Sequence, residues 1–278
     1  MPWAAVIGSP ISHSLSPVLH RAAWDSIGLG GHWVYDRIEV GADAAADFVR
    51  TLDSQCAGLS VTMPCKQAII PALDVLDPLA QAVGAVNTVI PSAGVLTGFN
   101  TDVHGIVASI SAARLERGME APRRGLILGA RATASSALAA LGSLGITRTA
   151  VAARRFGGPG SIVPAAARLG VDIDQVMWQD LPSVRAALAR AAVIVSTVPA
   201  GAADTLVADW TPRPDQTVLD VVYSPRDTPL RAACEAAGAL LVDGTEMLLH
   251  QAAQQVRLMT GRDPSTSSMR DALREALA

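Results

Sequence analysis

Lysine is almost absent from this chain. Of its 278 residues, 22 are lysine or arginine, and Lys66 is the single lysine among them. Arginine keeps its charge at any working pH, whereas a lysine ammonium can release a proton in a suitable environment. A lone lysine in an arginine-rich chain is therefore a candidate acid or base, a role that arginine cannot fill. The alternative is an ordinary surface lysine.

Other scarce features exclude whole classes of protein. No uncharged run forms an apolar block of about 18 residues, so we expect no membrane span. The net charge of −3 and the lack of a basic tract argue against nucleic acid or anionic lipid as a partner. The cysteines are few, odd in number and widely spaced (Cys56, Cys65 and Cys234), and the five histidines lack metal-ligand spacing. With no secretory leader at Met1, we expect a cytoplasmic globular protein without disulfides or metal.

Strand-like and helix-like segments alternate along the first hundred residues. The predicted strands are 3–8, 32–40, 58–62 and 85–90, and the predicted helices are 18–27 and 42–52. This alternation predicts a parallel sheet covered on both faces, and therefore an α/β fold. The polar segment 116–124 reads as a linker, so we expect a second domain beyond it.

Polar residues gather where predicted elements begin or end. Thr62, Lys66 and Asn87 lie in or just after strand-like runs, where parallel sheets form ligand crevices. Asp102 begins a predicted helix, either as its N-cap or as a carboxylate beside Lys66.

The serines before the first helix also allow two readings. Ser16 precedes Pro17 and could cap the helix. Alternatively, Ser14 and Ser16 could hold a carboxylate with their hydroxyl and N–H groups. The spacing alone leaves both readings open.

The second half of the chain begins like a dinucleotide-binding unit. A buried strand at 125–128 leads into a turn and a helix at 133–144, which is the position of the Rossmann phosphate loop G-x-G-x-x-G/A. Gly129 and Ala134 fit this pattern, but Arg131 replaces the middle glycine, so the loop alone leaves dinucleotide binding open. The next strand, 149–153, ends in Arg154 and Arg155. Arginine at this point accommodates a 2′-phosphate, which indicates NADP.

Taken together, these motifs resemble the shikimate dehydrogenase family in its actinobacterial style. The resemblance covers the whole chain and is carried by five segments in the family's order: 12–17 (SHSLSP), 61–66 (VTMPCK), 84–88 (GAVNT), 100–102 (NTD) and 244–251 (GTEMLLHQ). The loop at 129–133 and the Ala153–Arg155 segment depart from the glycine-rich and Asn-Arg-Thr sequences that are common in the family.

The resemblance implies a fold and an activity. The fold is α/β with two domains: a substrate-binding α/β domain (1–103) and a Rossmann-like NADP-binding domain (104–244), with C-terminal helices (245–278) returning to the first. The activity is reversible NADPH-dependent reduction of 3-dehydroshikimate to shikimate. A homodimer is compatible with the resemblance.

The resemblance also assigns roles to individual residues. Lys66 and Asp102 match the catalytic pair. Substrate-binding positions are Ser14, Ser16, Thr62, Asn87, Asp102, Tyr223 and Gln251. Cofactor-binding positions are Gly129, Ala130, Arg131, Ala132, Thr133, Arg154, Arg155, Val221 and Gly244.

Two alternative functions remain to be compared with this one. An NAD-dependent quinate/shikimate dehydrogenase is disfavoured by Arg154 and by the lack of an acidic residue between Arg148 and Gly170. A cofactor- or metabolite-binding paralogue without catalysis is disfavoured by the presence of both Lys66 and Asp102.

Overall fold

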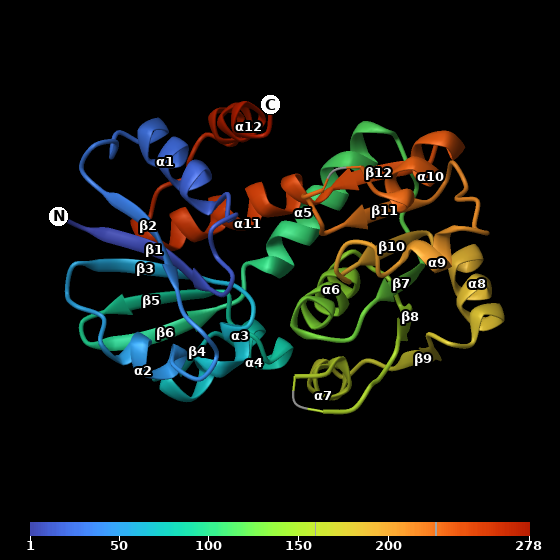
Figure 1. Ribbon diagram of the computed structural model, residues 1–278, viewed down its shortest axis with the longest axis horizontal. Coiled ribbons are helices and arrows are strands. Elements are labelled where there is room, and N and C mark those ends of the chain that lie inside the picture. Colours follow the sequence, from blue (N-terminus) through green and yellow to red (C-terminus); the bar gives the residue numbers. More distant parts are fainter. Residues whose placement is uncertain (159, 226) are drawn as a thin grey trace. The chain divides into compact units, whose positions relative to one another are not determined.

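The computed structural model describes residues 1–158, 160–225 and 227–278, and the chain divides into two compact units (Figure 1). The first unit contains Met1–Gly105 and Leu248–Ala278, and the second contains Ile106–Met247. Both boundaries fall inside helices, α5 (Asp102–Glu116) and α11 (Gly244–Thr260). The chain therefore leaves the first unit and returns to it within continuous helices.

The first unit is built on a mixed six-stranded sheet in the order β2-β1-β3-β5-β6-β4. Its strands are β1 (Trp3–Gly8), β2 (Val34–Glu39), β3 (Cys56–Val61), β4 (Val75–Leu76), β5 (Thr88–Ser92) and β6 (Val95–Phe99). The prediction of a wholly parallel sheet is wrong, because β5 runs antiparallel to both β3 and β6. A tight turn at Ala93 and Gly94, both with positive φ, joins β5 to β6, and so short a connection allows only antiparallel pairing.

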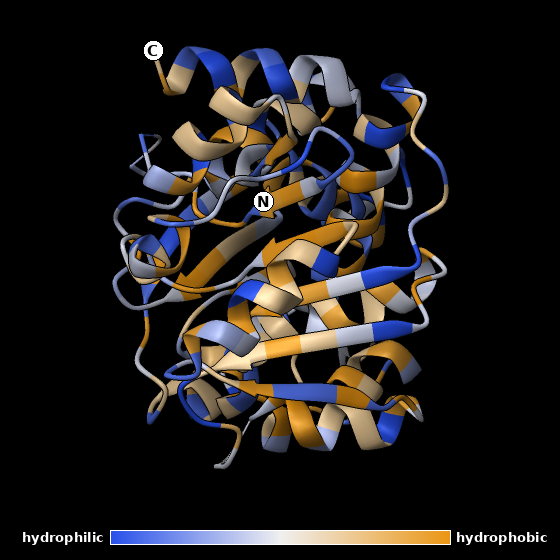
Figure 2. Cartoon of the chain, turned by 90° about the vertical axis from the view of Figure 1, so that its right-hand side faces the viewer, coloured by the Kyte–Doolittle hydropathy of each residue, from blue (hydrophilic) through white to orange (hydrophobic). Residues whose placement is uncertain are grey.

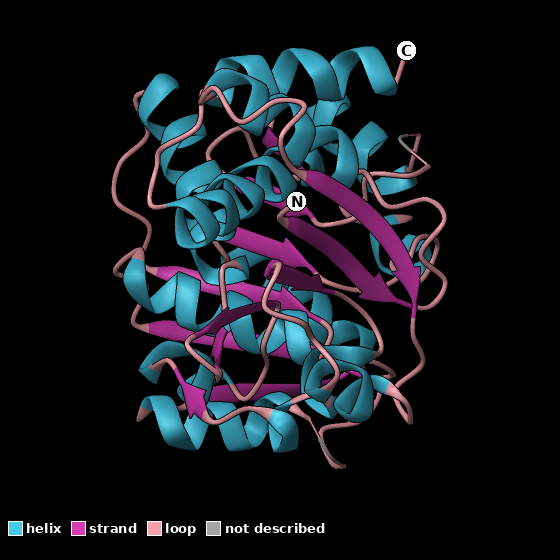
Figure 3. Ribbon diagram, turned by 90° about the vertical axis from the view of Figure 1, so that its left-hand side faces the viewer, coloured by secondary structure: helices cyan, strands magenta, loops and turns pink. Residues whose placement is uncertain are grey.

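Helices cover both faces of this sheet (Figures 1 and 3). They are α1 (Ser16–Ser26), α2 (Ala45–Arg50), α3 (Cys65–Ala68), α4 (Pro78–Val83), α11 and α12 (Thr266–Ala276), with a 3₁₀ turn at Ile70–Ala72. On one face, Ile7 and Leu59 pack with residues of α2, α3 and α4. On the other, Ala4 and Val6 pack with α1, α11 and α12. The alternation of inward side chains along β1 supplies both cores.

Helix α1 begins differently from the prediction. Leu15, not Ser16, occupies the N-cap position, and no side chain caps the helix. Ser16 is the first helical residue and Pro17 lies in the first turn, where its missing N–H costs nothing. Of the two readings left open for Ser16, the N-cap is therefore excluded, and its hydroxyl is used elsewhere.

The second unit is a parallel sheet in the order β12-β11-β10-β7-β8-β9. Its strands are β7 (Arg124–Leu128), β8 (Arg148–Ala153), β9 (Ile173–Met177), β10 (Val193–Ser196), β11 (Thr217–Asp220) and β12 (Leu240–Asp243). Counted along this unit, the order is 3-2-1-4-5-6, which is the dinucleotide-binding arrangement with its ligand crevice at the carboxyl ends of the strands. The interiors of these strands are largely hydrophobic (Figure 2).

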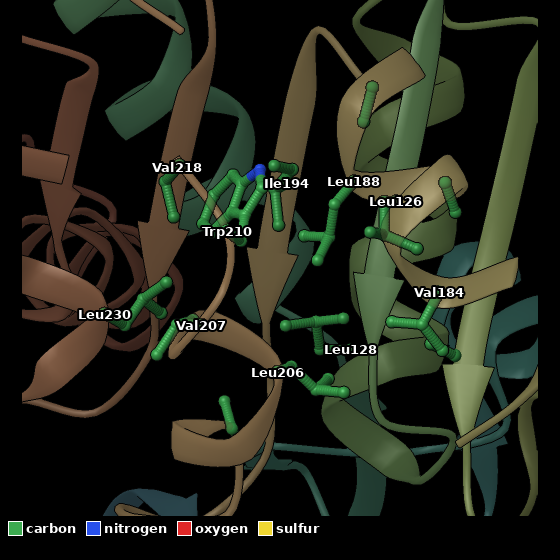
Figure 4. Packing of buried hydrophobic residues seen from close by; sticks show 14 of the residues in the cluster. Leu126, Leu128, Val184, Leu188, Ile194, Leu206, Val207, Trp210, Val218 and Leu230 are labelled. Atoms are coloured by element: carbon green, nitrogen blue, oxygen red, sulfur yellow. The ribbon is translucent and has the colours of Figure 1, made fainter. Parts of the chain in front are cut away.

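Helices connect successive strands of this unit. They are α6 (Ala132–Ser143), α7 (Ile162–Leu169), α8 (Leu181–Arg190), α9 (Asp204–Val207) and α10 (Pro229–Ala237). On one face of the sheet, Leu126 and Ile194 belong to a buried cluster with Leu188 of α8, Leu206 of α9 and Leu230 of α10 (Figure 4). These buried side chains fix the strand ends that carry polar residues. Among the residues that the structure describes, no helix combines the length and apolar character needed to cross a membrane.

Candidate active site

Lys66 and Asp102 form a largely buried ion pair. Lys66 lies in α3, directly after β3, and its Nζ donates to Asp102 Oδ2 over 2.5 Å. The Lys66 and Asp102 side chains are 15% and 6% exposed. Asp102 begins α5, where the helix dipole favours a negative charge. Lys66 is therefore not a solvated surface residue, and the predicted proximity of these two side chains is found in the structure.

Asn87 binds the second oxygen of the Asp102 carboxylate. Its Nδ2 donates to Asp102 Oδ1 (2.8 Å) and to Thr101 Oγ1 (2.9 Å), and its Oδ1 accepts from the Thr101 N–H (2.7 Å). A backbone N–H only donates and a carboxylate only accepts, so the amide orientation is fixed. Asn87 directly precedes the antiparallel β5. It lies beside the carboxyl end of β3, where the Val61 N–H donates to the Asn87 carbonyl oxygen (2.7 Å).

Gln251 completes this polar cluster from helix α11. Its Oε1 lies 3.3 Å from both Asn87 Nδ2 and Thr101 Oγ1. With Lys66, the cluster thus joins residues from four separate parts of the chain. Sequence reasoning named Lys66, Asn87, Asp102 and Gln251 but assigned no role to Thr101, although it stands beside Asp102 in one of the motifs.

The remaining predicted ligands of the first unit are Ser14 in the loop after β1, Ser16 at the start of α1, and Thr62 directly after β3. The Ser16 N–H donates to Ser14 Oγ (3.3 Å), and Arg37 donates through Nε and a terminal nitrogen to the Ser14 carbonyl oxygen at 2.9 and 2.6 Å. Ser16 is 5% exposed and shares a hydrogen bond with the Tyr35 hydroxyl. Thr62 follows β3 and donates its N–H to the Ile7 carbonyl (2.9 Å). Arg37 therefore holds in place the segment 12–16, which carries Ser14 and Ser16 and is called the serine loop below.

His20 is completely buried behind this serine loop. Its Nδ1 lies 2.8 Å from the Ser16 carbonyl oxygen, and its ring stacks on Tyr35 at a centroid distance of 4.1 Å. Because a carbonyl only accepts, Nδ1 carries the proton of the neutral ring. Nε2 has no hydrogen-bond partner among the described residues. Burial lowers the pKa of His20 from 6.5 to about 4.

This histidine makes the stability of the protein depend on pH. The unfolded chain binds a proton at His20 below pH 6.5, whereas the folded chain resists protonation until pH 4. The free energy of unfolding should therefore fall by about 2 kcal/mol between pH 7 and pH 5 through this residue. Chemical denaturation of the His20→Phe variant should show a correspondingly flatter pH dependence. The exposed His32→Gln variant should keep the wild-type slope; equal slopes in all three proteins would contradict the assignment.

The second unit contains a cavity of about 670 Å³ at the carboxyl ends of β7, β8, β9 and β10. Its lining residues are Gly129, Ala130, Arg131, Ala153, Arg154, Arg155, Trp178, Gln179, Thr197, Val198, Pro199 and Ala202. Three of these are arginines and none of the described lining residues is acidic, which suits a polyanionic ligand. Trp178 and Gln179 were not predicted, because β9 shows no clear alternation of hydrophobic and polar residues that would mark it as a strand.

The geometry of the turn after β7 fits a phosphate loop. Gly129 has φ +110°, and a Cβ there would lie 2.4 Å from Thr197 Oγ1, so only glycine fits. Arg131 directly precedes α6, whose first N–H groups have no partner within the helix and can bind an anion. A Cβ on Gly158 would lie 3.7 Å from an Arg131 guanidinium nitrogen. Arg131 thus reaches towards the loop that follows β8. Ala132 and Thr133 form the first turn of α6.

Three further predicted residues lie near the end of β11. A Cβ on Gly244 would lie 2.7 Å from the carbonyl oxygens of Asp220 and Val221, so glycine permits this close approach of α11. Tyr223 is partly buried, and burial raises the pKa of its hydroxyl. Val221, Tyr223 and Gly244 belong to the second unit, and their contacts with substrate or cofactor stay predictions.

Comparison with known proteins gives a consistent result. Residues 6–89 match the shikimate dehydrogenase substrate binding domain, and residues 244–274 match the shikimate 5′-dehydrogenase C-terminal domain. The NADP(+) shikimate dehydrogenase of Methylobacterium radiotolerans is 37% identical, with all of this chain and 98% of that protein covered.

Solved structures agree with the sequence relatives. Shikimate dehydrogenase from Mycobacterium tuberculosis has a TM-score of 0.86 and 35% identity, covering 99% of this chain and 100% of that one. The Thermus thermophilus enzyme in complex with NADP(H) and shikimate has a TM-score of 0.79 and 29% identity, covering 99% and 100%. With full-length similarity at this level of identity, the chain belongs to the shikimate dehydrogenase family.

Proposed function

We propose that this protein catalyses the reversible, NADP-dependent reduction of 3-dehydroshikimate to shikimate. The observation that carries the proposal is the largely buried Lys66–Asp102 pair, held within a cluster of amide and hydroxyl groups. Such a pair offers a titratable group next to neutral groups that can bind a polyhydroxylated ligand. The names of the relatives support the same substrate and cofactor.

The chemistry needs an acid at the substrate ketone. When bound, NADPH supplies a hydride, and negative charge then develops on the carbonyl oxygen. In our proposal Lys66 donates the proton to this oxygen, and Asp102 orients the ammonium while accepting from a substrate hydroxyl. In the reverse direction, Lys66 removes the proton from the hydroxyl of shikimate.

The other groups of the first unit would position the substrate. In our proposal Ser14 and Ser16 bind its carboxylate, and Thr62, Asn87 and Gln251 bind its hydroxyls. Tyr223 is the one proposed substrate ligand from the second unit. Holding several groups of one ring at once fixes the reacting carbon, which accounts for a large part of catalysis in such reactions.

The second unit would hold the cofactor. Gly129, Ala130 and the first turn of α6 (Ala132 and Thr133) would bind the pyrophosphate, with Arg131 adding charge beside these backbone groups. Arg154 and Arg155 would bind the 2′-phosphate. Val221 and Gly244 would border the nicotinamide. We assign substrate binding to residues 1–103 with the helices of 245–278, and cofactor binding to 104–244. All three cysteines are free and buried, which suits the reducing cytoplasm that we propose as its location.

A steady-state assay tests this function directly. Shikimate and quinate are each oxidised with NADP and with NAD, and the four values of kcat/KM are compared. We expect the highest value for shikimate with NADP. A higher value for quinate with NAD would identify a catabolic quinate dehydrogenase instead, and no turnover with any pair would identify a non-catalytic paralogue.

A further inference from the structure

A continuous line of buried hydrogen bonds leads from Tyr35 to Asn87, the residue that binds the Asp102 carboxylate. The Tyr35 hydroxyl donates to Ser60 Oγ (2.5 Å), and Ser60 donates to Gln255 Oε1 (2.8 Å). Gln255 Nε2 donates to the Asn87 carbonyl oxygen (3.0 Å) and to Thr88 Oγ1 (2.9 Å). Tyr35 and Thr88 are fully buried, and Ser60, Gln255 and Asn87 are 4%, 1% and 2% exposed. Each polar side chain in this line therefore depends on its neighbours for hydrogen bonds.

The direction of every bond in the line follows from groups that can only donate or only accept. Thr88 Oγ1 lies 2.8 Å from Asn87 Oδ1, an amide oxygen that only accepts, so Thr88 donates. Having used its one proton, Thr88 accepts from Gln255, whose NH₂ group must face it. The Asn87 carbonyl oxygen beside the same nitrogen requires this orientation independently.

The remaining part of the line is fixed in the same way. The oxygen of Gln255 faces Ser60 and accepts its proton, so Ser60 in turn accepts from Tyr35. One direction of donation thus runs from Tyr35 to Asn87, and Asn87 donates to the Asp102 carboxylate. Reversing any member would place two donors or two acceptors face to face, so the line has a single low-energy arrangement.

Gln255 is the member that joins separate elements. It lies on α11 one turn after Gln251, on the same face of the helix. Through its three hydrogen bonds it ties α11 to Ser60 on β3 and to the start of β5. Gln251 contacts Asn87 and Thr101 over 3.3 Å. Together with the buried apolar residues of α11, these hydrogen bonds hold the helix, and with it Gln251, against the sheet.

We propose that Gln255 is a positioning residue of this active site, which holds Asn87 and Gln251 in place around the Lys66–Asp102 pair. All three of its hydrogen bonds are to buried protein groups, so it acts through these neighbours and does not bind substrate. The inference rests on the proposed function, since it concerns the same site.

The test compares two buried glutamines. Gln255→Met keeps the side-chain volume but removes all three hydrogen bonds. The control is Gln216→Met in the second unit, because Gln216 is also fully buried and donates to two carbonyl oxygens, those of Leu188 and Ala191, at 2.7 and 2.8 Å. Both variants should lower Tm. Only Gln255→Met should lower kcat per folded enzyme, by about 10- to 100-fold, as expected when reacting groups move by a fraction of an ångström to one ångström.

A second pair of variants serves if Gln255→Met does not fold. Thr88→Val removes the hydroxyl between Gln255 and Asn87, whereas Thr88→Ser keeps it. We expect Thr88→Val to lower kcat by about 10-fold and Thr88→Ser to retain most of it. If Gln255 acts through Thr88, the effects of Gln255→Met and Thr88→Val on kcat are not additive in the double variant.

Two results would overturn the positioning role: unchanged kcat in both Gln255→Met and Thr88→Val, or an equal loss of kcat in Gln216→Met. The proposed function fails separately, if the wild-type enzyme turns over neither shikimate nor quinate. In that case a crystal structure of Gln255→Met decides the question without substrate. Displaced Asn87 and Gln251 side chains support the positioning role, and unchanged positions overturn it.

Discussion

Replacing Lys66 by alanine should lower kcat for shikimate oxidation by roughly 10²–10⁴-fold, the usual loss when a general acid or base is removed. Lys66 is the single lysine of the chain, and its ammonium lies 2.5 Å from Asp102 Oδ2. No arginine could take over a proton transfer at this point. The KM for shikimate should change far less, because in our proposal Asn87, Gln251, Ser14 and Ser16 still bind the ligand. Steady-state kinetics measure kcat and KM for the variant, and its Tm shows that it is folded.

The Lys66→Arg variant separates proton transfer from simple charge. Arginine keeps a positive charge beside Asp102 but cannot release a proton near neutral pH. If Lys66 transfers a proton, Lys66→Arg should be nearly as slow as Lys66→Ala. Near-normal turnover in Lys66→Arg would reject the acid–base role and leave Lys66 as a fixed positive charge that stabilises the developing oxyanion.

Replacing Arg154 by alanine should weaken NADP binding much more than NAD binding. Arg154 lines the cavity of the second unit directly after β8, where the 2′-phosphate is expected. A charge-assisted hydrogen bond contributes about 1.5–3 kcal/mol, which corresponds to roughly 10- to 150-fold in affinity. Only NADP carries the 2′-phosphate. The KM values for both cofactors, measured at saturating shikimate, give the comparison.

Arg131→Ala provides the matched control for this prediction. Arg131 lines the same cavity but precedes α6, next to the expected pyrophosphate, which NAD and NADP share. Its loss should therefore weaken both cofactors by similar factors. If Arg154→Ala weakens NAD and NADP equally, the 2′-phosphate assignment is wrong, and Arg154 contributes only to the general positive charge of the cavity.

Much of the candidate site could be predicted because its chemistry is visible in single residues. Lys66 stood out because it is the single lysine. Asp102, at the start of a predicted helix, was expected either to cap that helix or to lie beside Lys66. The structure places them in contact. The Rossmann-like character of the second unit was likewise expected, from the turn and helix that follow β7 and from the family resemblance, but its strand order is known only from the structure.

Other features depend on contacts between distant parts of the chain and could not be predicted from the local sequence. The direction of β5 is set by the turn at Ala93 and Gly94, which the sequence marks as a turn without showing which strands it pairs. Ser16 has the chemistry of an N-cap, but a buried partner, Tyr35, competes for its hydroxyl. Gln255 had a detectable signal, its spacing of four residues from Gln251, but its role depends on contacts with β3 and β5.

The single lysine also determines how the protein reacts with amine-selective reagents. Such a reagent meets one ε-amino group in this chain, that of Lys66, whose side chain is 15% accessible. Acylation of Lys66, followed by mass spectrometry of the peptide that contains it, therefore reports on the proposed site without any cofactor assay. A ligand that covers the ammonium should slow this modification.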